Sequence, residues 1–150
     1  ITTLDEDKRA QIRGKDVGFV FQSFHLMPRL TALDNVMLPL EISGDPYSMD
    51  KAQEALKQVG LSKRAKHFAT QLSGGEKQRV AIARSIVNKP KILFADEPTG
   101  NLDKKSSGSI TDLLFSLNAL INTTLVLVTH DLSLAEKCDE VYELDEGRLL

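Results

Sequence analysis

The second half of the chain alternates short apolar runs with a helical stripe, and this alternation restricts the possible folds more than any other feature. The runs Ile92 to Ala95 and Leu125 to Val128 have the length and composition of buried strands. A helix between them is indicated by apolar residues at helical spacing, which are Ile110, Leu113, Leu114 and Leu117. A strand, a helix and another strand in this order predict a parallel sheet. A short helix over about 132–137 and a final strand from Glu140 to Leu144 extend the pattern, and residues 145–147 are expected to turn the chain.

The first half adds one strand and three helices. Val17 to Phe21 is a β-rich run that stops at Gln22, after which the apolar residues recur at helical spacing. One helix is expected behind the capping box Thr31-x-x-Asp34, one from Ser48 or Asp50 up to Gly60, and one from Ser73-Gly-Gly75 to Asn88-Lys-Pro90. We therefore predict a single domain with a discontinuous α/β core, residues 1–22 and 86–150, interrupted by a mostly helical subdomain, residues 23–85.

Composition and charge exclude several classes of function. The chain has 150 residues and a formal net charge of -2, so it lacks the basic surplus of a nucleic-acid-binding domain. Its longest apolar run, around residues 124–128, is far shorter than the roughly 20 residues of a membrane-spanning helix, so membrane association is expected only through a partner. The single cysteine, Cys138, cannot form an internal disulfide, and without a leader-like opening segment we expect a cytoplasmic setting.

Two carboxylates, Asp96 and Glu97, follow the predicted strand that begins at Ile92. The carboxyl end of a parallel strand faces the crevice where such sheets bind ligands. Two adjacent acids allow one carboxylate to hold a magnesium ion and the next to orient a water molecule. The alternative is an ordinary solvated strand end, and the pair by itself does not decide between the two.

The segment Leu72-Ser-Gly-Gly-Glu76 opens the last helix of the first half. Ser73 and Glu76 have the spacing of a capping box, so a well-capped helix explains both residues. It does not explain Gly74 and Gly75, which lower helix stability but leave backbone N–H groups bare at the positive end of the helix dipole. An anion can approach closely there, and we therefore favour a phosphate-binding helix start.

Taken together, these motifs resemble those of the ATP-binding-cassette (ABC) ATPases, and the resemblance extends over essentially the whole chain. Leu72 to Arg84 is similar to the signature motif of the family, and Ile92 to Asp103 is similar to its Walker B motif running into the D-loop. Gln22 matches the Q-loop glutamine, and His130, after the strand that ends at Thr129, matches the switch histidine. Four motifs in the order of the family make coincidence a weak explanation.

The resemblance implies a P-loop NTPase (RecA-like) fold, with an α/β parallel-sheet core and an inserted helical subdomain. It also implies that two such domains pair head to tail, so that ATP held by one P-loop is covered by the signature helix of the other. Asp96 is then expected to bind Mg²⁺, and Glu97 is expected to polarise the attacking water. His130 is expected to touch the γ-phosphate, and Gln22 to contact the metal or the water. Residues expected to act on the ATP of the partner are Ser73, Gly74, Gly75 and Glu76, with Asp103 at the dimer seam.

Several of these roles have a simpler alternative. His130 could merely stand beside Asp131 at the start of the next helix, and Gln22 alone could be a surface amide. Arg79 and Arg84 are expected on the exposed side of the signature helix, in a structural role.

One motif of the family is absent from the sequence. The Walker A pattern Gly-x-x-x-x-Gly-Lys-Ser/Thr does not occur, because Gly14-Lys15 is followed by Asp16 and preceded at the required position by Arg9. We therefore expect a fragment that lacks the N-terminal P-loop strand and helix of the family, and a chain that is inactive by itself.

The function implied by the resemblance is the ATP-binding and ATP-hydrolysing subunit of an ABC transporter, which couples ATP-driven dimer closure to a membrane permease. The expected cofactors are ATP and Mg²⁺. The expected partners are a permease subunit and a second ATPase domain, at the inner face of the cell membrane. Phe21 to Phe24, Leu33 to Val36 and Pro98 to Asp103 are similar to the lipoprotein-release and macrolide-export branch, which suggests a lipophilic or envelope cargo. The alternative is a catalytically silent or non-transport member of the superfamily that acts through its signature motif in trans.

Overall fold

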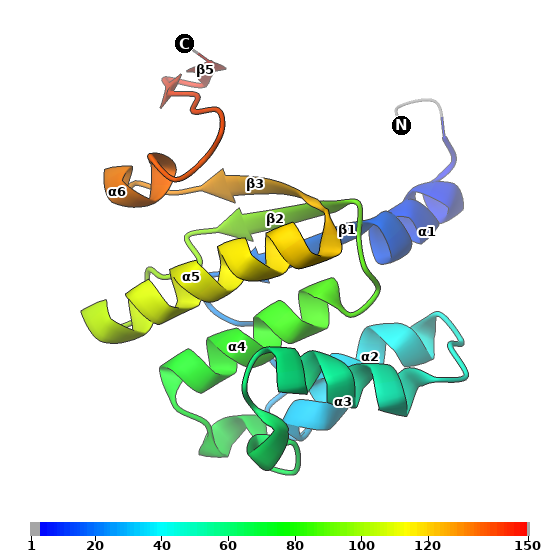
Figure 1. The fold of residues 1–150 in the computed structure, drawn as a ribbon. Coiled ribbons are helices and arrows are strands. Elements are labelled where there is room, and N and C mark those ends of the chain that lie inside the picture. The colour runs from blue at the N-terminus through cyan, green and yellow to red at the C-terminus, as the bar shows by residue number, and fades with distance from the viewer. Residues whose placement is uncertain (1–3, 150) are drawn as a thin grey trace.

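The computed structural model describes residues 4–149, which include a parallel sheet of three strands (Figure 1). The sheet has the order β1-β2-β3, and β2 pairs in parallel with both neighbours, so the prediction of a parallel sheet is confirmed. The register places Phe21, Asp96 and Val128 side by side, and the carboxyl ends of the three strands therefore lie at one edge of the sheet. The strands are β1 (Val17–Phe21), β2 (Ile92–Asp96) and β3 (Thr124–Val128).

Helices cover one face of this sheet. In Figure 1, α4 and α5 lie below the strands, and α2 and α3 lie on the far side of α4. The bounds are α1 Glu6–Asp16, α2 Ala32–Ile42, α3 Ser48–Gln58, α4 Gly74–Ile86, α5 Lys104–Ile121 and α6 Leu132–Ala135, with the short 3₁₀ turns η1 Ser62–Arg64 and η2 Ala69–Gln71.

Helix α4 is enclosed on most sides, as the width of its apolar stripe predicts. It contacts β1 above it, α2 and α3 below it and α5 beside it. Val80, Ile82 and Ala83 have no exposed surface. The approach to β1 is closest at Gly18, where an added Cβ would lie 2.9 Å from Cδ1 of Leu93 and closer still to the backbone of α4. Only glycine leaves room for this contact between strand and helix.

Helix α1 is an element that the sequence patterns did not predict. It begins behind Asp5, whose side chain accepts a hydrogen bond from the backbone N–H of Lys8 (2.8 Å). None of its residues is buried, so it has no apolar stripe that periodicity could detect. Gly14 and Lys15 lie in its last turn, and they therefore form no phosphate-binding loop.

The starts of α2 and α3 differ in how well they were predicted. The capping box of α2 is present as expected, because Thr31 and Asp34 satisfy each other's backbone N–H groups. Helix α3 begins at Ser48, one of the two expected starts, but no side chain caps it and Tyr47 occupies the N-cap position.

One face of the sheet is open among residues 4–149. The prediction of buried strands holds only for the face that α4 and α5 cover, and on the other face Val128 is 56% exposed. Continuous apolar runs are typical of strands covered on both faces, whereas the described helices cover one. Aromatic rings stack across the open face, with centroid distances of 5.7 Å for Phe19–Phe21 and 5.4 Å for Phe19–Phe94. The exposed apolar side chains of the strands are Phe19, Phe21, Ile92, Val126 and Val128.

The predicted final strand from Glu140 to Leu144 is wrong. Residues 140–143 have no regular structure, and only Leu144–Asp145 (β4) and Arg148–Leu149 (β5) pair, as a small antiparallel hairpin away from the main sheet (Figure 1). Glu146 and Gly147 both have positive φ, which is the backbone of a two-residue type I′ hairpin turn, so the predicted turn is confirmed. Strand-like composition indicates a tendency to pair but not which edge is within reach.

The expected division into a core and a helical subdomain, at residues 22 and 86, stays a prediction. Helices α2 and α3 do lie between β1 and β2 in the chain, but α4 packs against both β1 and α2. The hydrophobic core is accordingly continuous through both parts. None of the helices within residues 4–149 is long and apolar enough to span a bilayer.

The loop between β1 and α2 is fixed by the fully buried side chain of Asn35. Its Oδ1 atom accepts from the backbone N–H of Met27 (2.8 Å), and its Nδ2 donates to the carbonyl oxygens of Met27 (3.1 Å), Leu30 (3.3 Å) and Thr31 (2.9 Å). One side chain thus replaces the backbone partners that this irregular segment lacks.

We predict that Asn35→Ala lowers the free energy of unfolding by about 3 kcal/mol, because it leaves several buried backbone groups unpaired. Urea denaturation followed by circular dichroism measures the change. Gln58→Ala, at an exposed amide of α3, is the control and is expected to change stability by less than about 0.5 kcal/mol. Equal effects of the two substitutions would contradict the structural role of Asn35.

Candidate functional site

Three predicted site residues follow the aligned ends of the three strands. Gln22 follows β1, Glu97 follows Asp96 at the end of β2, and His130 comes two residues after the end of β3. Because β2 lies between its two neighbours, the carboxylates stand between the glutamine and the histidine. The sheet therefore brings together the residues that the sequence placed at separate strand ends.

The closest contact at this edge joins Glu97 and His130. The Oε1 atom of Glu97 lies 2.6 Å from Nδ1 of His130 and accepts from the backbone N–H of His130 at 2.9 Å. Glu97 has a φ of 43°, a left-handed conformation that costs energy for a residue other than glycine. Its own N–H donates to the carbonyl oxygen of Val128 (2.9 Å), which ties the turn after β2 to the end of β3.

His130 presents its ring to solvent. Its side chain is 84% exposed, compared with 22% for that of Glu97. The simpler alternative for His130 also applies in part, since the next residue, Asp131, caps α6 by accepting from the backbone N–H of Ser133 (2.9 Å). The cap explains Asp131, but it does not explain the contact of the histidine ring with Glu97.

Asp96 is an exposed carboxylate at the end of β2. Within residues 4–149 its side chain takes part in no hydrogen bond or ion pair, so its oxygens are available to a ligand. Mg²⁺ prefers carboxylate oxygens and keeps several of its waters, so it needs few protein ligands. A carboxylate of this kind, next to the Glu97–His130 pair, fits the chemistry of a magnesium nucleotide.

Gln22 is held by Asn101, a residue that the sequence patterns did not single out by itself. Nε2 of Gln22 donates to Oδ1 of Asn101 (3.2 Å), and Nδ2 of Asn101 donates to the backbone carbonyl of Gln22 (3.0 Å). Gly100 lies beside this contact, and a Cβ added to it would lie 2.7 Å from Nε2 of Gln22. A side chain at position 100 would therefore displace the glutamine.

The capping box at the start of α4 is present as predicted. Ser73 Oγ accepts from the backbone N–H of Glu76 (3.3 Å), and Glu76 Oε2 accepts from the backbone N–H of Ser73 (2.9 Å). This second bond is the main cause that holds the pKa of Glu76 below its usual value, with a further contribution from Arg64 (Nε to Oε1, 2.9 Å). Ser73 and Gly74 are exposed, so the backbone N–H groups of the first turn remain accessible to an anion.

The start of α4 lies beside the start of α5. An added Cβ at Gly75 would lie 3.4 Å from Oγ of Ser106, and one at Gly74 would lie 3.4 Å from Cδ2 of Leu102. Asp103 caps α5, and the hydroxyl of Ser106 is the main cause that lowers the pKa of Asp103. Within residues 4–149, no hydrogen bond links this region to Asp96, Glu97 or His130. The signature segment and the carboxylates are therefore two separate parts of the site.

Two polar side chains of α4, those of Gln78 and Arg84, donate hydrogen bonds to the backbone that follows β2 and β1. The sequence patterns did not predict these contacts. Gln78 is fully buried, and its Nε2 donates to the carbonyl oxygen of Pro98 at 2.6 Å. The expectation that Arg84 is exposed is wrong, because it donates to the carbonyl oxygens of Phe24 (2.9 Å) and His25 (2.7 Å), and burial lowers its pKa. A signal existed for Gln78, since it lies one turn before Ile82 on the buried face of the helix.

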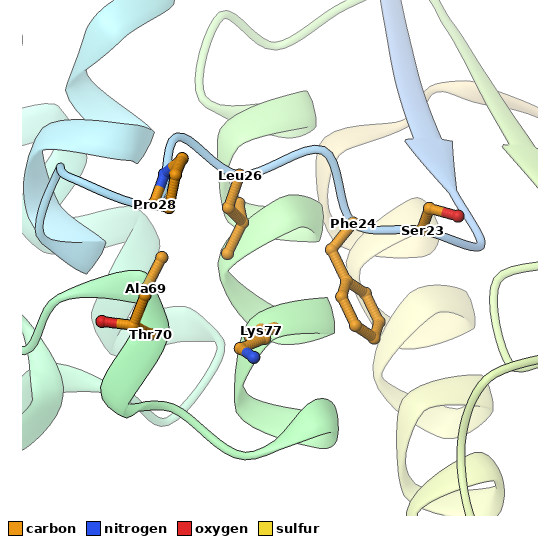
Figure 2. Close-up of a pocket in the computed structure, with 7 residues that line it drawn as sticks. All are labelled: Ser23, Phe24, Leu26, Pro28, Ala69, Thr70 and Lys77. Atoms are coloured by element: carbon orange, nitrogen blue, oxygen red, sulfur yellow. The ribbon is translucent and has the colours of Figure 1, made fainter.

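A shallow pocket of about 190 Å³ lies between the segment after Gln22, the turn η2 and helix α4 (Figure 2). Figure 2 shows the side chains of Phe24, Leu26 and Lys77 directed toward the space between these elements. Two large apolar side chains nearby in the sequence, Met27 and Phe68, are also exposed. The lining residues are Ser23, Phe24, Leu26, Pro28, Ala69, Thr70 and Lys77.

A comparison with known protein families decides which family has this arrangement. The family model described as "ABC transporter" matches residues 2–100. The chain belongs to the ABC transporter family. This confirms the resemblance found in the motifs, and it places the parallel sheet with its helices among the P-loop NTPase folds.

Relatives in the ABC transporter family support the assignment. The chain is 54% identical to the ABC transporter ATP-binding protein YbbA of Escherichia coli (strain K12), over 97% of this chain and 65% of the relative. It is 47% identical to the lipoprotein-releasing system ATP-binding protein LolD of Xanthomonas campestris pv. campestris (strain 8004), over 99% of this chain and 63% of that protein. The chain thus spans a little under two thirds of the length of these relatives.

The fold also matches a solved ABC cassette. The structure is that of the ATP-binding cassette MJ0796, described as the dimeric structure of a post-hydrolysis state bound to ADP and Pi. The TM-score is 0.84 at 42% identity, over 98% of this chain and 66% of that chain.

We predict that Gly100→Ala moves the side chain of Gln22, because the new Cβ occupies its place beside Asn101. Side-chain amide signals of Gln22 and Asn101 in NMR spectra are expected to shift, with a loss of stability below about 1 kcal/mol since both residues are exposed. Gly108→Ala is the matched control, because nothing lies within 4 Å of its added Cβ. Unchanged amide signals in Gly100→Ala would contradict the contact.

Proposed function

We propose that this chain is part of the ATP-hydrolysing subunit of an ABC transporter, in which ATP hydrolysis at the edge of the sheet drives a membrane permease. The observation that carries the proposal is the contact between Glu97 and His130, at 2.6 Å, beside the exposed carboxylate of Asp96. A carboxylate held by a histidine next to a metal-binding carboxylate is a suitable arrangement for activating water at a phosphate.

Asp96 and Glu97 have different tasks in this proposal. Asp96 holds Mg²⁺, directly or through water, together with Gln22 on the neighbouring strand end. When bound, Mg²⁺ neutralises charge on the phosphate oxygens. Glu97 accepts a hydrogen bond from the attacking water, and His130 keeps the Glu97 carboxylate in place through its ring and its backbone N–H.

The start of α4 acts on a second nucleotide. Ser73, Gly74 and Gly75 present an exposed helix N-terminus, and Glu76 completes the capping box. Because no hydrogen bond connects this segment to the carboxylates within residues 4–149, we propose that it binds the γ-phosphate held by a partner domain, with Asp103 at the seam. Pairing of two domains is supported by the MJ0796 structures, which are described as dimeric.

The phosphates also need a cradle of backbone N–H groups. Gly14 and Lys15 do not supply one, since they lie in helix α1. We propose that a Walker A loop outside this chain provides it, and that the 150 residues alone do not hydrolyse ATP. The greater length of the relatives is consistent with this proposal.

The pocket after Gln22 is the proposed permease contact. It follows the glutamine that responds to the nucleotide, and its lining combines the apolar side chains of Phe24 and Leu26 with the ammonium group of Lys77. Its occupant is then a short segment of the permease with apolar side chains and a carboxylate. Through this contact the subunit is held at the cytoplasmic face of the membrane.

We do not favour a catalytically silent or non-transport role. YbbA is described as an ABC transporter ATP-binding protein, and LolD as the ATP-binding protein of a lipoprotein-releasing system. The similarity to the lipoprotein-releasing proteins favours a lipophilic cargo, whose selection we assign to the permease.

We predict that Glu97→Gln, made in a protein extended upstream by a Walker A loop, lowers ATP hydrolysis by at least roughly 100-fold, because the amide cannot accept the proton of water. Calorimetry is expected to give an ATP affinity within about twofold of the unmodified protein. Glu136→Gln, at an exposed acid beyond α6, is the control and should leave hydrolysis unchanged. Full activity of Glu97→Gln would remove Glu97 from the reaction.

The same calorimetry compares the extended protein with the 150-residue chain. We expect Mg²⁺-ATP to bind the extended protein and not the shorter chain. Micromolar binding by the shorter chain would mean that other residues hold the phosphates, and the proposed site would have to be redrawn.

We also predict that Lys77→Glu weakens association with the permease by about tenfold or more, because it places a like charge against the proposed carboxylate of the permease. Co-purification of the two subunits in detergent measures the association. Lys63→Glu makes the same charge change at an exposed position of η1 and serves as the control. Equal association of both variants would place the permease contact elsewhere.

A further inference from the structure

One buried amide connects the signature helix to the two strand ends that carry Gln22 and Glu97. Gln78 of α4 has no exposed surface. Its Nε2 donates to the carbonyl oxygen of Pro98 at 2.6 Å and, at a longer distance of 3.4 Å, to that of Phe21. Since an amide nitrogen carries two hydrogens, both bonds can exist together. Phe21 directly precedes Gln22, and Pro98 directly follows Glu97.

Packing alone does not explain a glutamine at this position. The Oε1 atom of Gln78 is buried and has no hydrogen-bond partner within residues 4–149. A buried polar atom without a partner is unfavourable, so an apolar side chain of similar length would suit a purely structural role equally well. The two hydrogen bonds that Nε2 donates are therefore the reason for a glutamine at position 78.

We propose that Gln78 is a positioning residue for ATP hydrolysis, which fixes the backbone beside Gln22 and Glu97 relative to the start of the signature helix. The inference rests on the proposed function, because it assigns Gln78 an effect on the same reaction. Gln78 lies two residues after Glu76, the last residue of the capping box of α4, so a shift of the helix start also moves its amide. Phosphate binding at the start of α4 is thereby linked to the geometry of the water-activating carboxylate in the same chain.

The backbone around both contacts makes this link effective. Glu97 has a left-handed φ of 43°, and the segment after Gln22 contains two more left-handed residues, Phe24 and His25. Such conformations persist only where surrounding contacts hold them. Without the Gln78 amide, the turn after β2 loses a short hydrogen bond next to Glu97 and can relax.

The test compares Gln78→Met with Arg79→Met in the natural full-length protein. Methionine removes the unpaired oxygen of Gln78, but it leaves the carbonyl oxygen of Pro98 without its donor. Because one unpaired oxygen replaces another, the melting temperature should change little. Arg79 is the matched control, since it also donates from α4 to a backbone carbonyl, that of Val59 (2.9 Å), but away from both strand ends.

We expect Gln78→Met to lower kcat for ATP hydrolysis by roughly 10- to 100-fold, with ATP affinity within about twofold. Arg79→Met should keep kcat within about twofold. Without nucleotide, amide hydrogen exchange should become faster at residues 22–25 and at residues 97 and 99 in Gln78→Met only. This readout does not depend on hydrolysis, so it separates failure of the inference from failure of the proposed function.

A double-substitution cycle with Gln22→Ala distinguishes positioning from general destabilisation. If Gln78 acts partly through Gln22, the loss in kcat from Gln78→Met is smaller in the Gln22→Ala background than in the unmodified protein. The inference is overturned if Gln78→Met lowers kcat by the same factor in the Gln22→Ala background as in the unmodified protein. It is also overturned if Gln78→Met retains kcat, or if hydrogen exchange at the two segments is unchanged. Should Gln78→Met melt far below Arg79→Met, the cycle and the exchange are measured at a temperature where both variants are folded, and the same outcomes decide.

Discussion

The burial of helix α4 is the constraint on which the rest of the structure depends. Its apolar side chains, such as Val80 and Ile82, lie between the sheet and the helices α2 and α3, and burying each contributes about 1.5–3 kcal/mol. A helix held on several sides cannot rotate or slide without losing this packing. The polar groups along it therefore have fixed positions: the bare N–H groups after Ser73, the amide of Gln78 and the guanidinium of Arg84. Local sequence makes α4 a helix, but the packing around it determines what its polar groups can reach.

The sequence predicted the parts of the site whose position follows from strand ends. An apolar run followed by Asp96 and Glu97, and another followed by His130, suffice to place these residues at one edge, because parallel strands end on the same side. Contacts between distant segments could not be predicted in this way. Gln22 and Asn101 are 79 positions apart, and nothing in either local pattern indicates that their amides meet over Gly100. Arg84 was misplaced for the same reason, since helical periodicity says which side is polar but not that a loop covers it.

The strands show where a pattern is informative about one property and misleading about another. Continuous apolar runs correctly predicted strands, yet they also predicted burial on both faces, and one face is open within residues 4–149. Side chains alternate along a strand, so Ile92, Phe94 and Asp96 share this open face. The carboxylate proposed to hold Mg²⁺ thus stands on the side of the sheet away from α4 and α5, at the end of an exposed aromatic surface. Exposed apolar surface of this kind usually marks a contact with another segment or chain.

This geometry also bears on the proposal that one chain supplies two different half-sites. The start of α4 belongs to the layer of helices that covers one face of the sheet (Figure 1), whereas the alternation of side chains along β2 places Asp96 on the opposite face. The start of α5 lies beside the signature segment, with Ser106 against Gly75, and within residues 4–149 no hydrogen bond joins the start of α4 to Asp96 or Glu97. The proposed nucleotide site at Asp96 would then be completed from outside this helix layer. The buried amide of Gln78 is a direct hydrogen-bonded connection from α4 to the backbone beside Gln22 and Glu97, the residues of the other proposed half-site.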